Sequence, residues 1–289
     1  MKSNPPDDGR PEGRHHELPR ELADAITRAR PRLGGLASSI LFFPSIGSTN
    51  DVALSRNAKA LADRSEGRSD GLVVVADEQT TGRGRRGHTW FSPPGSGRYV
   101  SVVLAPSRAR VDTERATMLL TLTAGVALVE GIEAATGLRV DLKWPNDLQV
   151  SRRKLAGILA EASGAGGAAD RVVVGYGINV AATAFPPELC ERATSLETEL
   201  GRAVDRHHVL VETLASLARR YEDLLAGRFD AILDAWRRLA PAASGARITW
   251  TTLAGAYAGV TSGIDDRGAL LVRVGDRLER IVCGEVNWL

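Results

Sequence analysis

The chain has 289 residues, of which 43% are hydrophobic and 25% charged, a composition typical of a globular protein with one large domain and room for a smaller one. Its 37 basic and 35 acidic residues leave a net charge of +2 at pH 7, which argues against attraction of nucleic acid or membrane by the overall field. The 2 cysteines, Cys190 and Cys283, belong to no cluster with zinc-ligand spacing, and we expect both thiols in the core.

The first segment, residues 1 to about 20, is polar and rich in proline, which predicts a disordered tail. A short helix is expected at 18–30, ended by Pro31. The segment lacks the apolar core of a signal peptide, and no apolar run in the chain reaches the ~18 residues that a membrane helix needs. We therefore expect a cytoplasmic protein that does not contact a membrane.

The next part of the chain alternates short apolar runs with helical patterns. Strands are expected at 40–43, 72–76 and 99–105, because these runs are rich in β-branched and aromatic residues. A helix is expected to begin at Thr49 or Asn50, since Ser48 and Asp51 have the spacing of a capping box. A long helix is expected at 112–136, with apolar residues such as Met118 at helical spacing.

Three further strands are predicted at 140–144, 154–161 and 171–180, the first two separated by a turn at 145–147, and a flexible turn is expected at 164–167. In the last strand the apolar side chains alternate with a face that carries Gly175, Gly177 and Asn179. Two glycines on one face indicate that another group approaches the backbone closely. A neighbouring helix and a ligand both remain possible from this pattern.

Helices are predicted at 205–226 and 229–239, and short strands with a hairpin turn at 266–268 follow. This sequence of elements predicts an α+β protein with a small C-terminal β-module. We expect a tail and short helix at 1–37, a catalytic domain at 38–243 and a C-terminal domain at 244–289.

The stretch 82–87, GRGRRG, alternates arginine with glycine. It matches G-x-G-x-x-G literally, but Trp90 and two prolines follow where a dinucleotide-binding fold needs a helix, so we reject that fold. A long loop of this kind is typical of a lid that closes on a small anion. The alternative is a solvated basic loop.

A second motif, DLKWPNDLQVSRRKLAGILAE, begins at Asp141. Strand alternation places Asp141 and Lys143 on one face of the sheet, with Leu142 and Trp144 on the other. A lysine at the edge of a pocket suits a phosphate, whereas two surface lysines on a hairpin, Lys143 and Lys154, are the ordinary alternative. The hydroxyl and amide groups at 48–50 suit two roles, capping of a helix or binding of a small polar ligand.

Taken together and in this order, these segments resemble the biotin–protein ligase family, which is grouped with the lipoate–protein ligases in a class II synthetase-like superfamily. The matching segments are STN at 48–50, EQTTGRGRRGHTWFSPPGSGRYVS at 78–101, KWPNDL at 143–148, RKLAGILAE at 153–161 and GYGINV at 175–180. GAYAGVTSGIDDRGALLV is similar to the SH3-like cap of that family. The lipoate relatives lack both GRGRRG and KWPND, so the resemblance favours biotin.

The resemblance implies a central mixed β-sheet with flanking helices, as in class II synthetases, and a small C-terminal SH3-like β-barrel. It also implies a ligase that forms C–N bonds, biotin–[biotin carboxyl-carrier protein] ligase (EC 6.3.4.15). Such an enzyme makes biotinyl-5′-AMP from biotin and ATP with Mg²⁺, and then transfers biotin to a lysine of a biotin carboxyl carrier domain. Biotinyl-adenylate is destroyed by water, which explains why an arginine-bearing loop should close over it.

The roles implied for individual residues fall into four sets. Biotin would contact Ser48, Thr49, Asn50, Gln79, Gly82, Arg83, Gly84, Arg85, Lys143 and Gly157. ATP or the adenylate would contact Arg85, Arg86, Trp90, Lys143, Asn146 and Asn179. Arg85, Lys143 and Lys154 would act in catalysis, with Arg85 and Lys143 at the α-phosphate and Lys154 in the transfer step. Asp147 is the candidate ligand of Mg²⁺.

The sequence departs from the family pattern in three places. His88 stands where many relatives have arginine or lysine, and CGEVNWL lacks the basic residue that many carry in the final turn. The segment before residue 40 is too short for a winged helix, so we expect a monofunctional ligase that does not bind DNA, as a monomer or homodimer. A non-catalytic sensor and a nucleic-acid-binding module are the competing interpretations.

Overall fold

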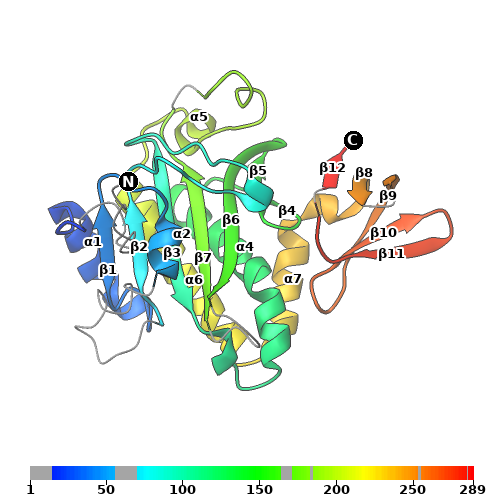
Figure 1. Cartoon of the computed structure of the whole chain (residues 1–289), viewed down its shortest axis with the longest axis horizontal. Coiled ribbons are helices and arrows are strands. Elements are labelled where there is room, and N and C mark those ends of the chain that lie inside the picture. Colours follow the sequence, from blue (N-terminus) through cyan, green and yellow to red (C-terminus); the bar gives the residue numbers. More distant parts are fainter. Residues whose placement is uncertain (1–14, 56–69, 164–170, 183–184, 253–254, 285) are drawn as a thin grey trace, which may run out of the picture.

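The structure is a computed structural model that describes residues 15–55, 70–163, 171–182, 185–252, 255–284 and 286–289. Most of the expected N-terminal tail and the turn expected at 164–167 lie outside these residues. Two sheets organise the described part of the chain, a larger central one and a smaller C-terminal one (Figure 1).

The central sheet has seven strands in the order β1-β2-β3-β7-β6-β5-β4. Their bounds are β1 Ile40–Phe43, β2 Val73–Ala76, β3 Gly97–Leu104, β4 Asp141–Lys143, β5 Asp147–Val150, β6 Arg153–Ser163 and β7 Arg171–Asn179. β1 and β2 pair in parallel and the other neighbours pair antiparallel, so the sheet is mixed, as expected. β2 and β3 are buried along their whole length, which their β-branched sequences favour.

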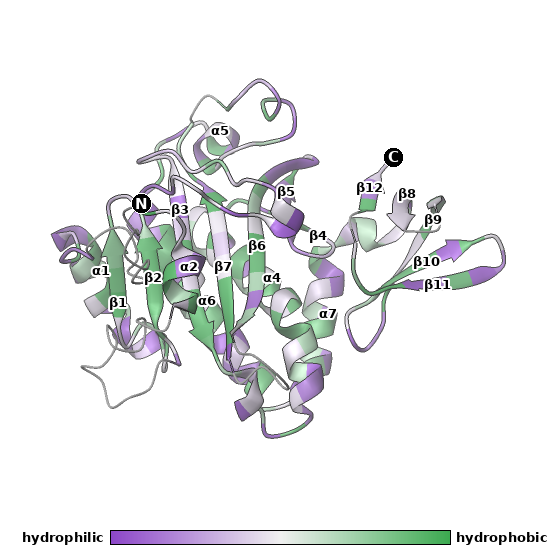
Figure 2. Cartoon of the chain, viewed as in Figure 1, coloured by the Kyte–Doolittle hydropathy of each residue, from purple (hydrophilic) through white to green (hydrophobic). Residues whose placement is uncertain are grey.

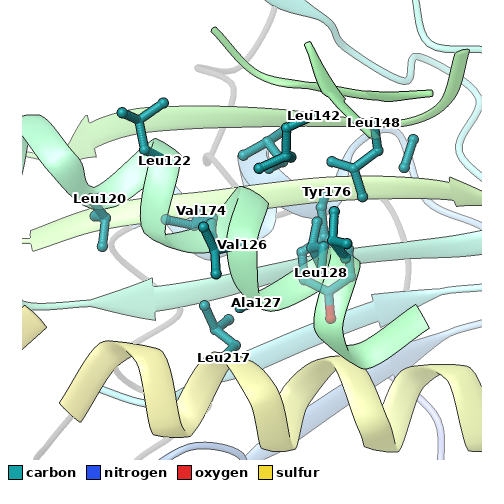
Figure 3. Close-up of a cluster of buried hydrophobic side chains, with 14 of the residues drawn as sticks. Leu120, Leu122, Val126, Ala127, Leu128, Leu142, Leu148, Val174, Tyr176 and Leu217 are labelled. Carbon is teal, nitrogen blue, oxygen red and sulfur yellow. The ribbon is translucent and has the colours of Figure 1, made fainter. Parts of the chain in front are cut away.

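Four helices cover one face of this sheet: α1 Arg20–Ala29, α4 Thr113–Thr136, α6 Arg206–Leu225 and α7 Phe229–Leu239. Figure 3 shows how side chains of α4 and α6 meet Val174 and Tyr176 of β7 in the main core. The opposite face carries the short helix α2, Thr49–Leu54, with Val52 in a second cluster that includes Val173. The predicted alternation of side chains between the two faces of β7 is therefore confirmed. The face with Val174 and Tyr176 meets α4 and α6, and the glycine-bearing face is turned toward α2.

Helix α4 is the central helix of the molecule. The Asp112 carboxylate accepts a hydrogen bond from the Arg115 amide (2.9 Å), and Gly137 ends the helix with φ +77°. By length and composition α4 could cross a membrane, but 67% of its most apolar window is buried inside the protein, which is the environment of a core helix. Met118, expected on the buried face, is 46% exposed because it lies on the outward side near the beginning of α4.

The C-terminal sheet has five antiparallel strands in the order β11-β10-β9-β8-β12. Their bounds are β8 Ser244–Thr252, β9 Gly255–Ile264, β10 Leu270–Val274, β11 Arg277–Ile281 and β12 Val286–Trp288. The predicted α+β class with a separate small β-module is thus confirmed. The module docks on the central domain through the Trp144 indole, which donates to the Gly268 carbonyl (3.0 Å), and through Arg115 Nε, which donates to the Asp266 carbonyl (2.9 Å).

Several local expectations were wrong or incomplete. Cys190 and Cys283 are both exposed, because they lie in surface connections and not in packed elements. Ser48 precedes α2, but its side chain makes no capping hydrogen bond. The sequence did not predict β5, the short helix α5 (Leu196–Leu200) or the 3₁₀ turns η1 (Arg30–Arg32), η2 (Arg85–Gly87), η3 (Pro106–Arg108) and η4 (Pro241–Ala243). Figure 2 shows that hydrophobic residues concentrate in the central strands and on the inner sides of the helices.

Candidate functional site

The glycine face of β7 is covered by two other segments. A Cβ atom placed on Gly175 would lie 2.0 Å from Oδ1 of Asn50, which begins helix α2. A Cβ atom placed on Gly177 would lie 2.3 Å from Nε1 of Trp90, in the loop that contains GRGRRG. Both glycines are therefore required by close approach, once by a helix and once by the loop.

A buried network of neutral polar groups joins α2 to the beginning of this loop. Gln79 Oε1 accepts hydrogen bonds from the Thr49 amide (2.9 Å) and the Thr49 hydroxyl (3.1 Å). Ser101 Oγ lies within hydrogen-bond distance of two acceptors, Thr49 Oγ1 (2.8 Å) and Asn50 Oδ1 (2.5 Å). Gln79 Nε2 donates to Ser92 Oγ (3.1 Å). Because these groups hold one another in place, they form a preorganised polar wall. Ser101 was not predicted as a site residue, although it is a polar residue in an apolar strand and ends the matching segment at 78–101.

An arginine–carboxylate cluster ties the loop to α2 and β6. Arg83 donates from both Nη atoms to the Glu161 carboxylate (3.0 and 2.8 Å), and its Nη2 lies 2.7 Å from Asp51 Oδ1. Asn50 Nδ2 donates to the same Glu161 carboxylate (2.7 Å). We call these contacts of Arg83 with Glu161 and Asp51 the Arg83 latch, because they join the loop to β6 and α2. The sequence predicted neither this role of Arg83 nor the participation of Glu161.

Asp77, the first residue of the loop between β2 and β3, holds the two ends of that loop together. Its carboxylate accepts hydrogen bonds from the Gly95 amide (3.1 Å) and from Arg206 Nη1 (2.7 Å). Arg98 lies beneath this end, 2% exposed, and donates from Nε to the Arg206 carbonyl (2.8 Å). Burial lowers the pKa of Arg98 to about 10, with the neighbouring Arg206 charge adding to the effect, so Arg98 stays charged at neutral pH.

Lys154 and Trp90 lie together over the floor of the site. Lys154 Nζ is 5.2 Å from the centre of the Trp90 ring and 2.7 Å from Asp147 Oδ1. A Cβ atom on Gly157 would lie 3.1 Å from both Lys154 Cε and Trp90 Cζ3. The buried Trp90 Nε1 has no hydrogen-bond partner among the described residues, so it is available to an acceptor on a ligand.

Arg85 lies at the far end of the site from α2. Its Nη1 donates to Asn146 Oδ1 (3.1 Å), and Asn146 Nδ2 donates to the Ile158 carbonyl (2.8 Å). The turn before β5 therefore positions Arg85 beside β6. The site thus combines neutral hydroxyl and amide groups and the paired charges of Arg83 and Glu161 on the α2 side with Arg85 and Lys154 beside β5 and β6.

A cavity of about 50 Å³ lies between these groups. Of the residues predicted as site residues, it is lined by Ser48, Thr49, Asn50, Gln79, Arg83, Gly84, Arg85, Trp90, Asn146, Lys154 and Gly157. The fold therefore brings these eleven residues together around one cavity. The volume is small for a ligand pocket, which is typically ~300–1,000 Å³.

Five predicted residues do not line this cavity. Gly82 is packed beneath the loop, where a Cβ atom would lie 2.5 Å from the Trp90 carbonyl, and Asn179 donates from Nδ2 to the Thr194 carbonyl (3.0 Å). Asp147 pairs with Lys154, and the half-buried Lys143 is its register partner across β4 and β5. Arg86 is exposed, with its Nη2 3.9 Å from the position that a Cβ atom on Gly284 would occupy.

No group of three or more His, Cys, Asp or Glu side chains suited to a metal ion occurs in the described parts of the chain. A site built by protein ligands alone is therefore not found there. Asp147 is paired with Lys154, and apart from this ion pair its buried Oδ1 accepts no hydrogen bond from a described residue.

Comparison with known proteins gives similarities over most of the chain. The model of the biotin/lipoate A/B protein ligase family matches residues 42–179. The bifunctional ligase/repressor BirA of Bacillus subtilis is 36% identical over 93% of this chain and 80% of that protein. The biotin–[acetyl-CoA-carboxylase] ligase of Paracoccus denitrificans is 36% identical over 76% of this chain and 90% of that protein.

Among solved structures, the biotin protein ligase from Aquifex aeolicus in complex with biotin and ATP superposes with a TM-score of 0.73 and 27% identity. The match covers 87% of this chain and 99% of that chain. The similarity therefore extends across both sheets.

Proposed function

This chain belongs to the biotin/lipoate A/B protein ligase family, and from that premise we propose that it is a biotin–protein ligase. It uses ATP to convert biotin into biotinyl-5′-AMP and then transfers biotin to a lysine of a biotin carboxyl carrier protein. The observation that carries this proposal is that one cavity is lined both by the hydroxyl and amide network of Thr49 and Gln79 and by the cations Arg85 and Lys154. A ureido ring needs neutral donors and acceptors, whereas a carboxylate and phosphates need cations.

In the first half-reaction, a biotin carboxylate oxygen attacks the α-phosphorus of ATP and the bond to pyrophosphate breaks. In the second, the carrier lysine attacks the biotinyl carbonyl and AMP leaves. Neither step needs a nucleophile from the enzyme, so the enzyme's work is positioning and charge stabilisation. We assign Arg85 and Lys143 to the α-phosphate, and Lys154 to the carboxylate end of biotin and to the transfer step.

The position of the Trp90 ring in the site supports the function of the loop as a lid. At about 50 Å³ the cavity does not admit a bicyclic ligand, and the Trp90 ring lies beside Lys154 above Gly157 and Gly177. Binding therefore requires Trp90 to move, and we infer that Asp77 holds the two ends of the loop together while the half that carries Arg83 opens. When the loop closes again it excludes water from a hydrolysable adenylate.

Mg²⁺ fits the site as an ion shared between one carboxylate and the phosphates of ATP, which is the usual mode for this ion. Asp147 would hold it, since apart from the ion pair with Lys154 its buried Oδ1 accepts no hydrogen bond from a described residue. The ion would neutralise phosphate charge.

The carrier partner follows from the relatives' printed activity. Biotin–[acetyl-CoA-carboxylase] ligases of Paracoccus denitrificans and Mycobacterium tuberculosis are 36% and 34% identical to this chain. We infer that the carrier domain of an acyl-CoA carboxylase is the acceptor, and that the chain acts in the cytoplasm as a ligase alone, without DNA or membrane, as a monomer or homodimer.

The complete reaction can be tested by mass spectrometry of a biotin carboxyl carrier domain incubated with the purified chain, ATP, Mg²⁺ and biotin. We expect one biotin on one lysine of the carrier, and no modification when lipoate replaces biotin or when ATP is omitted. An unmodified carrier under the complete conditions would contradict the proposal.

A further inference from the structure

The loop between β2 and β3 begins and ends at one group of residues, Asp77, Gly95, Arg98 and Arg206, which we call the hinge cluster. Asp77 follows β2 and Gly95 lies just before β3, and Asp77 Oδ2 accepts a hydrogen bond from the Gly95 amide (3.1 Å). The other oxygen, Oδ1, lies 2.7 Å from Arg206 Nη1 and 3.9 Å from Arg98 Nη1. Both ends of the loop therefore depend on one carboxylate, which two guanidinium groups face.

Arg98 occupies a position of β3 where the strand pattern favours an apolar residue. Alternation places it on the helix-covered face together with three residues of the main core, Val100, Val102 and Leu104. Arg98 is only 2% exposed, and its buried Nη2 has no hydrogen-bond partner among the described residues. Burial of an incompletely paired charge opposes folding. A residue that breaks the local pattern at a cost in stability is expected to serve function.

The buried arginine makes the hinge cluster hard to separate. Arg98 Nε donates to the Arg206 carbonyl (2.8 Å), and so fixes the first turn of α6, from which the Arg206 side chain reaches Asp77. The ion pair with Asp77 is the only one that Arg98 makes in the described part of the chain. If Asp77 moved away, the Arg98 charge would be buried without a carboxylate beside it, which is an unfavourable state. The hinge is thus held from the α6 side of the sheet, opposite to α2 and Trp90.

We propose that Arg98 and Arg206 are positioning residues of the ligase reaction, which keep the two ends of the loop joined at Asp77 while the half that carries Arg83 opens and closes. The inference rests on the proposed function, in which this loop is a lid over the adenylate. Neither arginine lines the ligand cavity, so both act through Asp77. A hinge of fixed geometry returns the arginine-rich half to the same closed position, which keeps water from the biotinyl carbonyl.

The first test is amide hydrogen exchange of the purified chain without ligands, read at Gly95. Arg206→Gln removes the ion pair with Asp77 and should speed exchange at Gly95 by about two- to fivefold, the loss of one partly exposed ion pair. Arg206→Lys keeps a point charge beside Asp77 and should exchange within about twofold of the wild type. Arg220→Gln is the matched control, because Arg220 is a half-buried arginine of the same helix that pairs with Glu130 instead. It should leave exchange at Gly95 unchanged.

Arg98→Leu separates positioning from stability. It replaces a buried cation by an apolar side chain, and Asp77 keeps its pair with Arg206, so the variant should unfold at a temperature no lower than that of the wild type. Exchange at Gly95 should nevertheless be about two- to fivefold faster. A lower unfolding temperature with faster exchange throughout the central sheet would identify Arg98 as a support of the core and would contradict its role at the hinge.

The second test measures how well the lid protects the adenylate. Without a carrier, water attacks the biotinyl carbonyl, AMP leaves and biotin is regenerated. Arg206→Gln and Arg98→Leu should raise the ratio of this AMP release to biotin transfer by about two- to fivefold, whereas Arg220→Gln should keep the wild-type ratio. A protein that is merely less stable loses both rates together, so the ratio reports positioning.

Exchange at Gly95 and an AMP ratio equal to those of Arg220→Gln, in both Arg206→Gln and Arg98→Leu, would overturn the inference. So would an Arg206→Lys protein as perturbed as Arg206→Gln, since the charge beside Asp77 would then not matter. The proposed function fails separately, if the wild type forms no AMP from ATP and biotin. Faster exchange at Gly95 in the hinge variants of such a protein would still support the hinge.

Discussion

At the scale of single residues, the site depends on the absence of side chains as much as on their presence. The hydrogen of Gly177 leaves the space that Trp90 fills, and the hydrogen of Gly175 leaves the space for the amide of Asn50. The polar wall, the indole and Lys154 are held together by these two close approaches. A methyl group at either position forces part of the site to move.

Gly177→Ala should weaken biotin binding by about tenfold or more, because its Cβ would lie 2.3 Å from Trp90 Nε1 and displace the indole from the site. Titration calorimetry with biotin measures this effect. Gly35→Ala is the control, since a Cβ atom there meets nothing within 4 Å and its φ is ordinary. Equal biotin affinity in Gly177→Ala and Gly35→Ala would show that Trp90 does not need its present position.

Sequence motifs identified the residues that face the first cavity, but they missed the partners that hold those residues. Ser101 and Glu161 end two of the matching segments and Asp77 stands just before one of them, but local spacing does not show which residues they contact. Glu161, for example, meets Arg83 across 78 positions of the chain. Such pairings arise from the folded sheet, so a reading of local spacing cannot predict them.

At the scale of elements, the loop between β2 and β3 is the moving part and its two anchors differ in strength. The Arg83–Glu161 and Arg206–Asp77 pairs are similarly exposed (37%/26% and 31%/29%). They differ in their third member, because Asp77 lies beside the buried Arg98 whereas Arg83 also pairs with the exposed Asp51, so the Arg83 latch is the part that can open. The loop should therefore open from its arginine-rich half.

Glu161→Gln should speed amide hydrogen exchange in the loop and weaken biotin binding by about three- to fivefold, since it removes one carboxylate charge from the latch. Glu130→Gln is the matched control, because Glu130 on α4 also pairs with arginines, Arg219 and Arg220, and is similarly exposed. It should leave loop exchange and biotin affinity unchanged. Faster loop exchange in both variants, or in neither, would refute the latch.

The regular elements were the most predictable part of the fold, because their boundaries have local causes. Helix α4 begins after Asp112 and ends at Gly137, and α6 begins after Asp205, at the positions that the sequence predicted. The four-residue strand β5 and the five-residue helix α5 were missed, since elements of this length have too few residues to show a period. Met118 was misplaced because helical spacing near the beginning of α4 does not specify how far the buried face extends, and both cysteines were misplaced because residue type alone does not distinguish a surface connection from the core.

At the scale of the whole molecule, the crossing of α4 and α6 connects the central sheet to the helices packed outside α4. A Cβ atom on Gly131 of α4 would lie 2.5 Å from Thr213 Cα of α6, so these two helices are in backbone contact. α4 in turn packs on the central sheet, and its first part meets the turn of the C-terminal sheet. Movement at this crossing would therefore reach both domains.

Gly131→Ala should lower the free energy of unfolding by ~1–3 kcal/mol, because overpacking against backbone outweighs the gain of up to ~1 kcal/mol in helix propensity. Denaturant titration measures this. Gly125→Ala is the control, since its nearest neighbour is the Leu142 side chain at 3.1 Å, which can turn away, and its stability should change by less than ~1 kcal/mol. A Gly131→Ala protein at least as stable as Gly125→Ala would contradict the tight crossing.

The central claim is adenylation of biotin at the cationic end of the site, and biotin-dependent exchange of labelled pyrophosphate into ATP measures it most directly. The wild type should catalyse exchange only with biotin present. Arg85→Gln and Lys143→Gln should each lower the rate by about 100-fold or more, the usual loss for a group that stabilises developing charge. Arg139→Gln, which changes an exposed arginine just beyond the end of α4, should match the wild type. Absence of exchange from a wild-type protein that still binds biotin, or exchange that needs no biotin, would contradict the account.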